Sequence, residues 1–261
     1  MRILLLTCFA VFLFSCNSSS KKDPGQAMDD TARMDNPPAN TLNFTIEPVK
    51  ILASDIPVSI KVKGKIQAAW KWTDKQGDNI LITTHVEPYD DKRKNEYGEE
   101  GQTAELHAVL FLKKGDRYEN IWMLNDEEKS CPFDITCAFI ENSTTITDLD
   151  KDGFAEVKLQ YSLACRSDVS PATMKIMIYE NGEKYSLSGL MWLPYSPDFK
   201  YDVTEKDVNL ENVPKLKDET EEMLRSFGRY QSEKDFTKAP SEFLTFARSE
   251  WLKYSKEKMG E

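Results

Sequence analysis

The stretch MKIMIYENGEKYSLS, residues 174–188, decides the fold. Asn181-Gly182 at its centre is among the strongest short signals for a tight β-hairpin, because both residues adopt positive φ at little cost. The residues on either side, 174–179 and 184–188, read as strands. This part of the chain is therefore predicted to form an antiparallel hairpin.

Two further segments before this hairpin show the same strand–loop–strand pattern. In each segment, two β-like runs flank a short loop that contains glycine. The two predicted hairpins are residues 66–72 and 80–86 around the loop 74–78, and residues 105–112 and 118–124 around the loop 113–116. The charged stretch 88–102 between them is predicted to be an exposed, mobile loop. The middle of the chain is thus predicted to be an antiparallel β-meander.

The C-terminal part of the chain carries a helical pattern. Residues 216–227 are rich in helix formers, and apolar residues recur at helical spacing from Pro240 onward. These apolar residues are Phe243, Leu244, Ala247, Trp251, Leu252 and Tyr254. We expect this amphipathic helix to pack on the sheet of its own domain; a membrane surface or a partner protein is the alternative. The predicted fold class is α+β, with a hairpin-rich β domain over residues 42–200 and C-terminal helices over residues 201–261.

Size and composition narrow the function. The chain has 261 residues, of which 40% are hydrophobic, which is enough for a packed core. Its net charge of −10 argues against nucleic acid as a partner, because phosphate binding needs a basic face. The histidines, His85 and His107, are too few for a catalytic zinc site with three histidine ligands.

The N-terminus reads as a targeting segment. Residues 1–15 carry one arginine and then an apolar run that is short for a membrane span, as in a secretory signal peptide. Leu13-Phe14-Ser15-Cys16 resembles the bacterial lipobox, which implies cleavage before Cys16 and lipidation of its thiol. Several acyl chains hold a protein on a membrane durably. The alternative is an ordinary signal peptide in which Cys16 is incidental.

The residues after Cys16 predict a tether. Residues 16–41 are polar and contain too little apolar surface to fold. Asn17, rather than aspartate, follows the lipidated cysteine, which favours the outer membrane in lipoprotein sorting of the Gram-negative type. We therefore expect an outer-membrane lipoprotein of the cell envelope, with the leaflet left open.

The acidic loop, residues 148–156 (DLDKDGFAE), carries the one pattern with clear chemistry. It places carboxylates at Asp148, Asp150, Asp152 and Glu156 around the glycine at 153. Ca²⁺ takes six to eight oxygen ligands, and alternate acids around a sharp turn converge on one point. The loop is therefore predicted to bind Ca²⁺, most simply as a structural ion that stiffens the hairpin.

The acidic loop is not an EF-hand. Leu159 stands where an EF-hand has its bidentate glutamate, and the flanking residues alternate as strands do. The loop resembles the calcium loop of FG-GAP and related β-propeller repeats, but this chain holds one copy, which does not make a propeller. The alternative interpretation is a plain acidic turn at Asp152-Gly153.

The cysteines beyond Cys16 predict one disulfide and one free thiol. Cys131, Cys137 and Cys165 would meet an oxidising compartment in an exported protein. Cys131 and Cys137 can close a small loop, or either can reach Cys165. Spacing alone does not choose between these pairings.

Residues 131–189 resemble a family of uncharacterised bacterial exported lipoproteins, some of which are labelled surface polysaccharide biosynthesis proteins. The segments that carry the resemblance are CPFD at 131–134, TDLDKDGFAEV at 147–157, CRSDVSP at 165–171 and MKIMIYE at 174–180. The family has cysteines at the positions of Cys131 and Cys165 but not of Cys137, which implies a Cys131–Cys165 disulfide. The resemblance implies an exported protein linked to a polysaccharide pathway, and it brings no catalytic residue.

Two further residues form a candidate ligand-binding corner. Arg166 and Asp168 stand beside Ser170-Pro171, just beyond the strand that follows the acidic loop. The alternative is a turn in which the arginine pairs with one of the nearby carboxylates.

The function predicted from these features is a non-enzymatic, membrane-anchored envelope lipoprotein that binds an envelope glycan or an envelope protein. Trp70 and Trp72, with Tyr89 and Trp192, are candidate sugar-stacking residues, although aromatic residues at period two are more often core. A purely structural role with the C-terminal helix as docking element is a further hypothesis.

An enzymatic alternative rests on carboxylates. A carbohydrate-active enzyme that assembles or trims surface polysaccharide would use residues such as Asp148, Glu156 or Asp168 as acid and base. Nothing in the sequence resembles a nucleophile with its base, so no catalytic residue is assigned.

Overall fold

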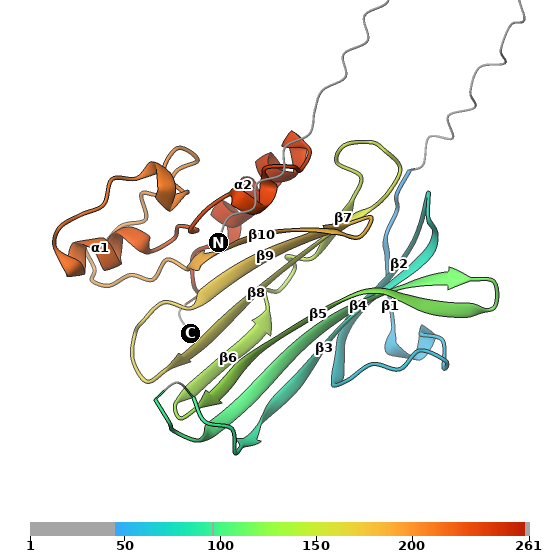
Figure 1. The fold of residues 1–261 in the computed structure, drawn as a ribbon, viewed down its shortest axis with the longest axis horizontal. Coiled ribbons are helices and arrows are strands. Elements are labelled where there is room, and N and C mark those ends of the chain that lie inside the picture. The colour runs from blue at the N-terminus through green and yellow to red at the C-terminus, as the bar shows by residue number, and fades with distance from the viewer. Residues whose placement is uncertain (1–44, 96, 259–261) are drawn as a thin grey trace, which may run out of the picture. The chain divides into compact units, whose positions relative to one another are not determined.

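The computed structural model describes residues 45–95 and 97–258. The described chain forms two antiparallel β-sheets that face each other, with helices against the outer face of the second sheet (Figure 1). The predicted signal peptide (1–15), the lipidation site Cys16 and the tether (16–41) lie outside the described residues. No helix among the described residues has the length and apolar character to cross a membrane.

The first sheet contains the two N-terminal hairpins. Its strands, in spatial order, are β1 (Val49–Ile51), β2 (Lys65–Asp74), β3 (Gly77–Asp91), β4 (Gly101–Lys114) and β5 (Arg117–Cys131). Both predicted hairpins are present, with longer strands than predicted. The predicted loop 88–102 is correspondingly shorter, because β3 pairs with β4 as far as Asp91 and Gly101.

The second sheet contains the hairpin quoted first. Its strands, in spatial order, are β10 (Glu183–Leu190), β9 (Thr173–Glu180), β8 (Glu156–Arg166) and β6 (Asp134–Phe139), with β7 (Thr145–Thr147) also paired to β8. The turn between β9 and β10 has φ of 44° at Asn181 and 87° at Gly182. Positive φ at both central residues is what a two-residue hairpin turn needs, so the sequence signal is confirmed here.

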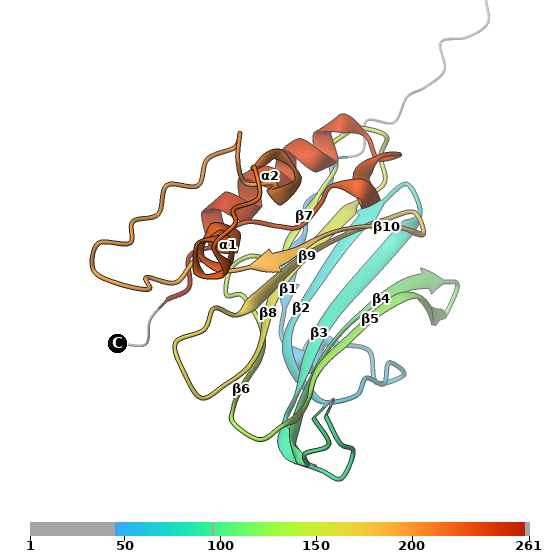
Figure 2. The same cartoon turned by 60° about the vertical axis from the view of Figure 1, so that its left-hand side comes forward.

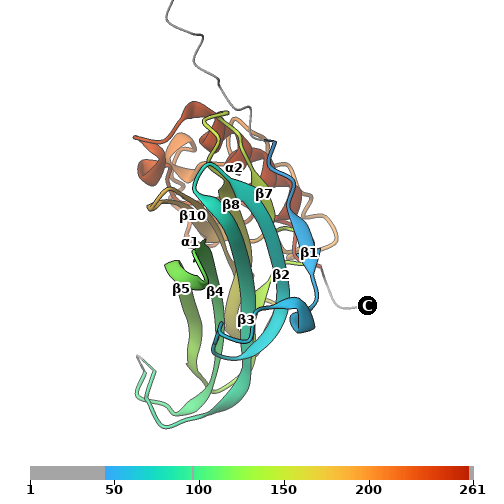
Figure 3. The same cartoon turned by 90° about the vertical axis from the view of Figure 1, so that its right-hand side faces the viewer.

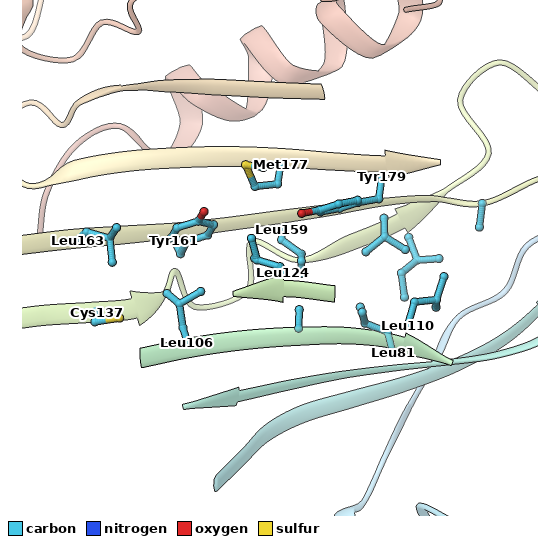
Figure 4. Close-up of a cluster of buried hydrophobic side chains, with 14 of the residues drawn as sticks. Leu81, Leu106, Leu110, Leu124, Cys137, Leu159, Tyr161, Leu163, Met177 and Tyr179 are labelled. Carbon is cyan, nitrogen blue, oxygen red and sulfur yellow. The ribbon is translucent and has the colours of Figure 1, made fainter. Parts of the chain in front are cut away.

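The main core lies between the two sheets. Alternate residues of β4 face the second sheet, as the period of two in a strand requires. Leu81, Leu106 and Leu110 of the first sheet belong to one buried cluster with Leu159 and Met177 of the second sheet (Figure 4). The prediction of a meander did not include this division into two facing sheets.

The outer faces of the two sheets are covered by different parts of the chain. Helix α2 (Ser241–Tyr254) packs on the second sheet through Phe243 and Trp251, which are fully buried (Figure 2). A shorter helix, α1 (Glu219–Ser226), begins after Asp218, whose side chain caps its first turn. The apolar stripe of the C-terminal helix therefore packs on its own domain. The outer face of the first sheet is covered in part by irregular chain around Ile60.

An ion pair inside the helix-covered layer fixes α2 to β8. Lys158 has no exposed surface, and its Nζ donates to the Glu250 carboxylate and to Gln160 Oε1. A buried charge needs such a partner, because its desolvation is costly. Two helices and two five-stranded sheets make the described fold β-rich, and α+β describes it only broadly.

Candidate functional site

The acidic loop connects β7 to β8 and is held in a defined shape. Its turn uses positive φ at Lys151 (63°) and at Gly153 (89°). The backbone N–H of Lys75, in the β2–β3 turn, donates to Gly153 O at 2.8 Å, and the N–H of Ala155 donates to Asp74 Oδ2 at 3.3 Å. The loop is thus attached to the first sheet as well as to the second.

The loop brings the four predicted ligands into one region. Asp148, Asp150 and Glu156 each place an oxygen within 4.8 Å of the others. Asp150 and Asp152 form a second group of the same kind with Glu180, the last residue of β9. Either group has the donor atoms to hold a metal ion, and Asp150 belongs to both.

Burial raises the pKa values of Glu180, Glu156 and Asp150, and repulsion between carboxylates adds to the rise at Glu180 and Asp150. The pKa of Glu180 is raised to about 8 by burial and by the charges of Asp150, Glu156 and Asp152. Burial raises the pKa of Glu156 to about 6, and burial together with Asp152 and Asp148 raises that of Asp150. Like charges held close together disfavour ionisation. The surroundings therefore oppose full ionisation of the cluster.

The chain supplies little positive charge to this cluster. In the described part of the chain, none of the Lys or Arg ion pairs involves a carboxylate of the cluster. Lys75 is nearby, but its Nζ lies over the Phe154 ring and donates to Asp152 O at 3.3 Å. Glu180 Oε1 is buried and has no hydrogen-bond donor among the described residues. The arrangement is open to a cation from solution.

Glu156 plays a different part from the three aspartates. Its oxygens accept hydrogen bonds from the N–H of Leu149, at 3.0 and 2.9 Å, and from the hydroxyl of Thr147, at 3.0 Å. These bonds close the base of the loop across the start of β8. Glu156 is 1% exposed, so it anchors the loop whether or not it also reaches an ion.

The predicted ligand corner lies at the far end of β8. Arg166 forms a two-pronged ion pair with Glu257 and also donates to Ser170 O. Asp168 Oδ1 accepts from the N–H of Ser170 at 3.0 Å. Both side chains thus take part in the turn and in its attachment to the C-terminal segment.

The disulfide lies at the same end of the second sheet. Cys131 and Cys165 are bonded, which is the pairing that the family resemblance implies. Cys137 is free and buried, and burial raises the pKa of its thiol to about 12. A thiol of that pKa is not a nucleophile at neutral pH.

Of the carboxylates named for the enzymatic alternative, Asp148 and Glu156 come together in the acidic loop, with oxygens within 4.8 Å of each other, whereas Asp168 lies apart from both. Asp168 follows the C-terminal end of β8, whereas Glu156 begins that strand. Strand β8 has 11 residues, so ten rises of about 3.3 Å per residue separate its two ends by about 33 Å. A pair of catalytic carboxyl groups in a glycosidase is about 5 to 9.5 Å apart.

The candidate stacking residues are also dispersed. Trp72 is buried in the core between the sheets, and its Nε1 donates to Asp74 Oδ2. Tyr89 donates its hydroxyl to Glu105, and Trp192 stacks on Phe199.

Glu180 is the site residue that the sequence analysis missed. It stands 24 residues beyond Glu156, and the sequence pattern places it in the turn that contains Asn181-Gly182. Strand β9 pairs with β8 so that Tyr179 lies opposite Val157, which brings Glu180 beside the loop. The order of strands in the sheet, which the sequence does not state, was the missing information.

Comparisons of the chain with protein-family models, with curated proteins and with solved structures find no match. The fold and the site therefore define a class of structure only: a two-sheet β-sandwich with a helical layer and an acidic loop able to hold a metal ion.

Proposed function

We propose that this protein is a non-enzymatic, lipid-anchored lipoprotein of the cell envelope whose β-sandwich is stiffened by Ca²⁺ in the acidic loop. The protein acts as a module that binds surface polysaccharide or takes part in its assembly. Support for the anchor comes from the lipobox-like sequence ending in Cys16 and from the polar residues that follow it. Support for the link to polysaccharide comes from the resemblance of residues 131–189 to exported lipoproteins.

One observation carries the calcium part of the proposal. Carboxylates from the loop and from β9 converge, their pKa values are raised, and the described chain offers them no ion-pair partner. Oxygen donors of this kind and number suit Ca²⁺, which binds flexible carboxylate ligands. A bound Ca²⁺ would join β7, β8 and β9 at one point. No pair of carboxylates is proposed for catalysis.

The calcium site is tested by calorimetric titration of the whole chain, purified in detergent. We expect saturable Ca²⁺ binding that is lost in Asp150→Asn, because Asp150 belongs to both groups of ligands. Asp116→Asn is the matched control, since Asp116 is an exposed acid in the turn between β4 and β5. Equal binding by the Asp150 variant and the wild type would refute the site.

The anchor is tested separately in cells. A radiolabelled fatty acid should be incorporated into the wild-type chain and not into Cys16→Ala, and only the wild type should fractionate with membranes. Membrane association of Cys16→Ala equal to that of the wild type would refute lipid anchoring at this residue.

A further inference from the structure

A cleft lies between the two sheets beside β1 and β2. Figure 3 shows the first sheet from the side on which these two strands form its edge. Its volume is about 450 Å³, within the range of small-molecule sites, which is about 300 to 1,000 Å³. One wall is the inner face of β2 and β3, and the other is the end of β6 with the residues that lead to β7. This cleft, the Trp70 cleft, is separate from the acidic loop.

The floor of the Trp70 cleft is aromatic. Trp70 and Phe139 line it, and both are half-buried against the main core. The Nζ of Lys50 lies 5.9 Å from the centre of the Trp70 ring, at the outer limit of a cation–π contact. At this distance the contact is weak, so a ligand can displace the lysine from the face of the Trp70 ring.

Polar side chains surround this floor, and several have no partner. Gln67, Asn142, Thr144 and His85 line the cleft. The side-chain amide of Gln67, the Thr144 hydroxyl and the indole N–H of Trp70 make no hydrogen bond to the described residues. Amides and hydroxyls both donate and accept, so they suit a ligand that is rich in hydroxyl groups.

The charged side chains that line the cleft favour neither an anionic nor a cationic ligand. Lys50 and Glu141 line it with opposite signs. A phosphate or carboxylate ligand would require an excess of cations, and an organic cation would require the reverse. An uncharged ligand fits the balance.

We propose that the Trp70 cleft binds a short stretch of neutral pyranose saccharide. A pyranose presents C–H groups on its faces, which stack on an aromatic ring, and hydroxyl groups around its rim, which the amides and hydroxyls of the cleft bind. The proposal rests on the proposed function, a module linked to surface polysaccharide, and gives that module its binding site. Of the four aromatic residues considered from the sequence, Trp70 is the one that lines the cleft.

The test is titration of the whole chain, purified in detergent, with maltotriose, cellotriose and chitotriose, followed by calorimetry and tryptophan fluorescence. At least one of these probes should bind with a change in fluorescence. Trp70→Ala should weaken that binding by at least about tenfold, which corresponds to 1.4 kcal/mol. Tyr195→Ala, which removes an exposed ring outside the cleft, should leave it unchanged.

Two more variants guard against misfolding, because Trp70 is half-buried. Gln67→Ala and Asn142→Gly change exposed residues of the cleft, and glycine tolerates the φ of 57° at position 142, so each should weaken binding severalfold with little change in melting temperature. No binding of any probe up to about 10 mM, or binding unaffected by all three cleft variants, would overturn the proposal.

The same preparation is titrated with Ca²⁺ and assayed for lipid. Bound Ca²⁺ and lipid without saccharide binding would overturn the cleft alone. Saccharide binding that depends on Trp70, in a chain that binds neither Ca²⁺ nor lipid, would support the cleft and refute the anchor and the calcium site.

Discussion

Two glutamates at the acidic site, Glu156 and Glu180, and two carboxylates that pair with arginine elsewhere, Asp91 and Glu222, have pKa values shifted in opposite directions. The pKa of Asp91 is lowered to about 2 by hydrogen bonds from Thr103 and Arg93. Arg225 lowers the pKa of Glu222 to about 2. In both places a donor from the chain stabilises the ionised form.

The acidic loop and the end of β9 show the reverse. Burial raises the pKa of Glu156 to about 6, and burial together with the charges of Asp150, Glu156 and Asp152 raises the pKa of Glu180 to about 8. The contrast shows that Asp91 and Glu222 have an arginine partner from the chain, whereas the carboxylates of the cluster have no lysine or arginine partner among the described residues. A divalent cation supplies the missing balance in our proposal.

The largest expected effect concerns a buried carboxylate that the chain itself neutralises. Glu250→Leu leaves Lys158 charged, fully buried and without its carboxylate partner. We expect a loss of about 3 to 5 kcal/mol in the free energy of unfolding, measured by urea denaturation.

The double variant Lys158→Met/Glu250→Leu is the matched control. It removes both charges, so its stability should return close to that of the wild type. A single variant as stable as the wild type would show that Lys158 finds other compensation in the folded state.

The next effect concerns the uncompensated cluster. Ca²⁺ at about one hundred times its dissociation constant should stabilise the domain by about 2.7 kcal/mol, seen as a higher melting temperature. Chelator should reverse the shift, and Asp150→Asn should abolish it. An equal shift in wild type and Asp150→Asn would place the ion elsewhere.

A smaller effect is the dependence of metal-free stability on pH. Because the pKa of Glu180 is raised in the folded state, the folded chain holds this proton more tightly than the unfolded chain does. The contribution of this proton to stability is complete below about pH 4.5 and is lost as the pH rises through about 8. Stability in chelator should therefore fall between pH 5 and pH 9.

Glu180→Gln isolates this contribution, because the amide cannot ionise. The variant should lose less stability than the wild type over the same pH range, measured by thermal melts in chelator. Identical pH profiles for the two chains would show that Glu180 titrates normally.

The smallest effect is expected at an exposed pair. Lys234 and Glu211 lie 3.1 Å apart, and the lysine side chain is 79% exposed. Lys234→Ala should change the free energy of unfolding by less than about 1 kcal/mol, since solvent screens such pairs. A larger loss, measured by urea denaturation, would mean that surface balance matters more here than the comparison implies.

Local features of the fold were predictable from the sequence. Asn181-Gly182 predicted its hairpin because the turn depends on two adjacent residues. The spacing of apolar residues from Phe243 to Trp251 predicted the helix and its buried face. The division of the strands into two facing sheets depends on contacts between distant segments, and no local pattern encodes it.

The part of the candidate site that lies in one continuous segment was likewise predictable from the sequence. Four of its carboxylates lie within the acidic loop, where a known spacing identifies them. Glu180 joins them only through the pairing of β9 with β8. The Trp70 cleft likewise needs both sheets, since Trp70 and Phe139 come from different ones.

The most direct test of the calcium site is a crystal structure of the protein grown with Ca²⁺ and, in parallel, with Tb³⁺ as an anomalous scatterer. The account predicts an anomalous peak in contact with Asp150, with carboxylate oxygens of the cluster at about 2.3 to 2.6 Å from the calcium ion. Well-ordered carboxylates with no ion between them, in crystals that contain millimolar Ca²⁺, would contradict it.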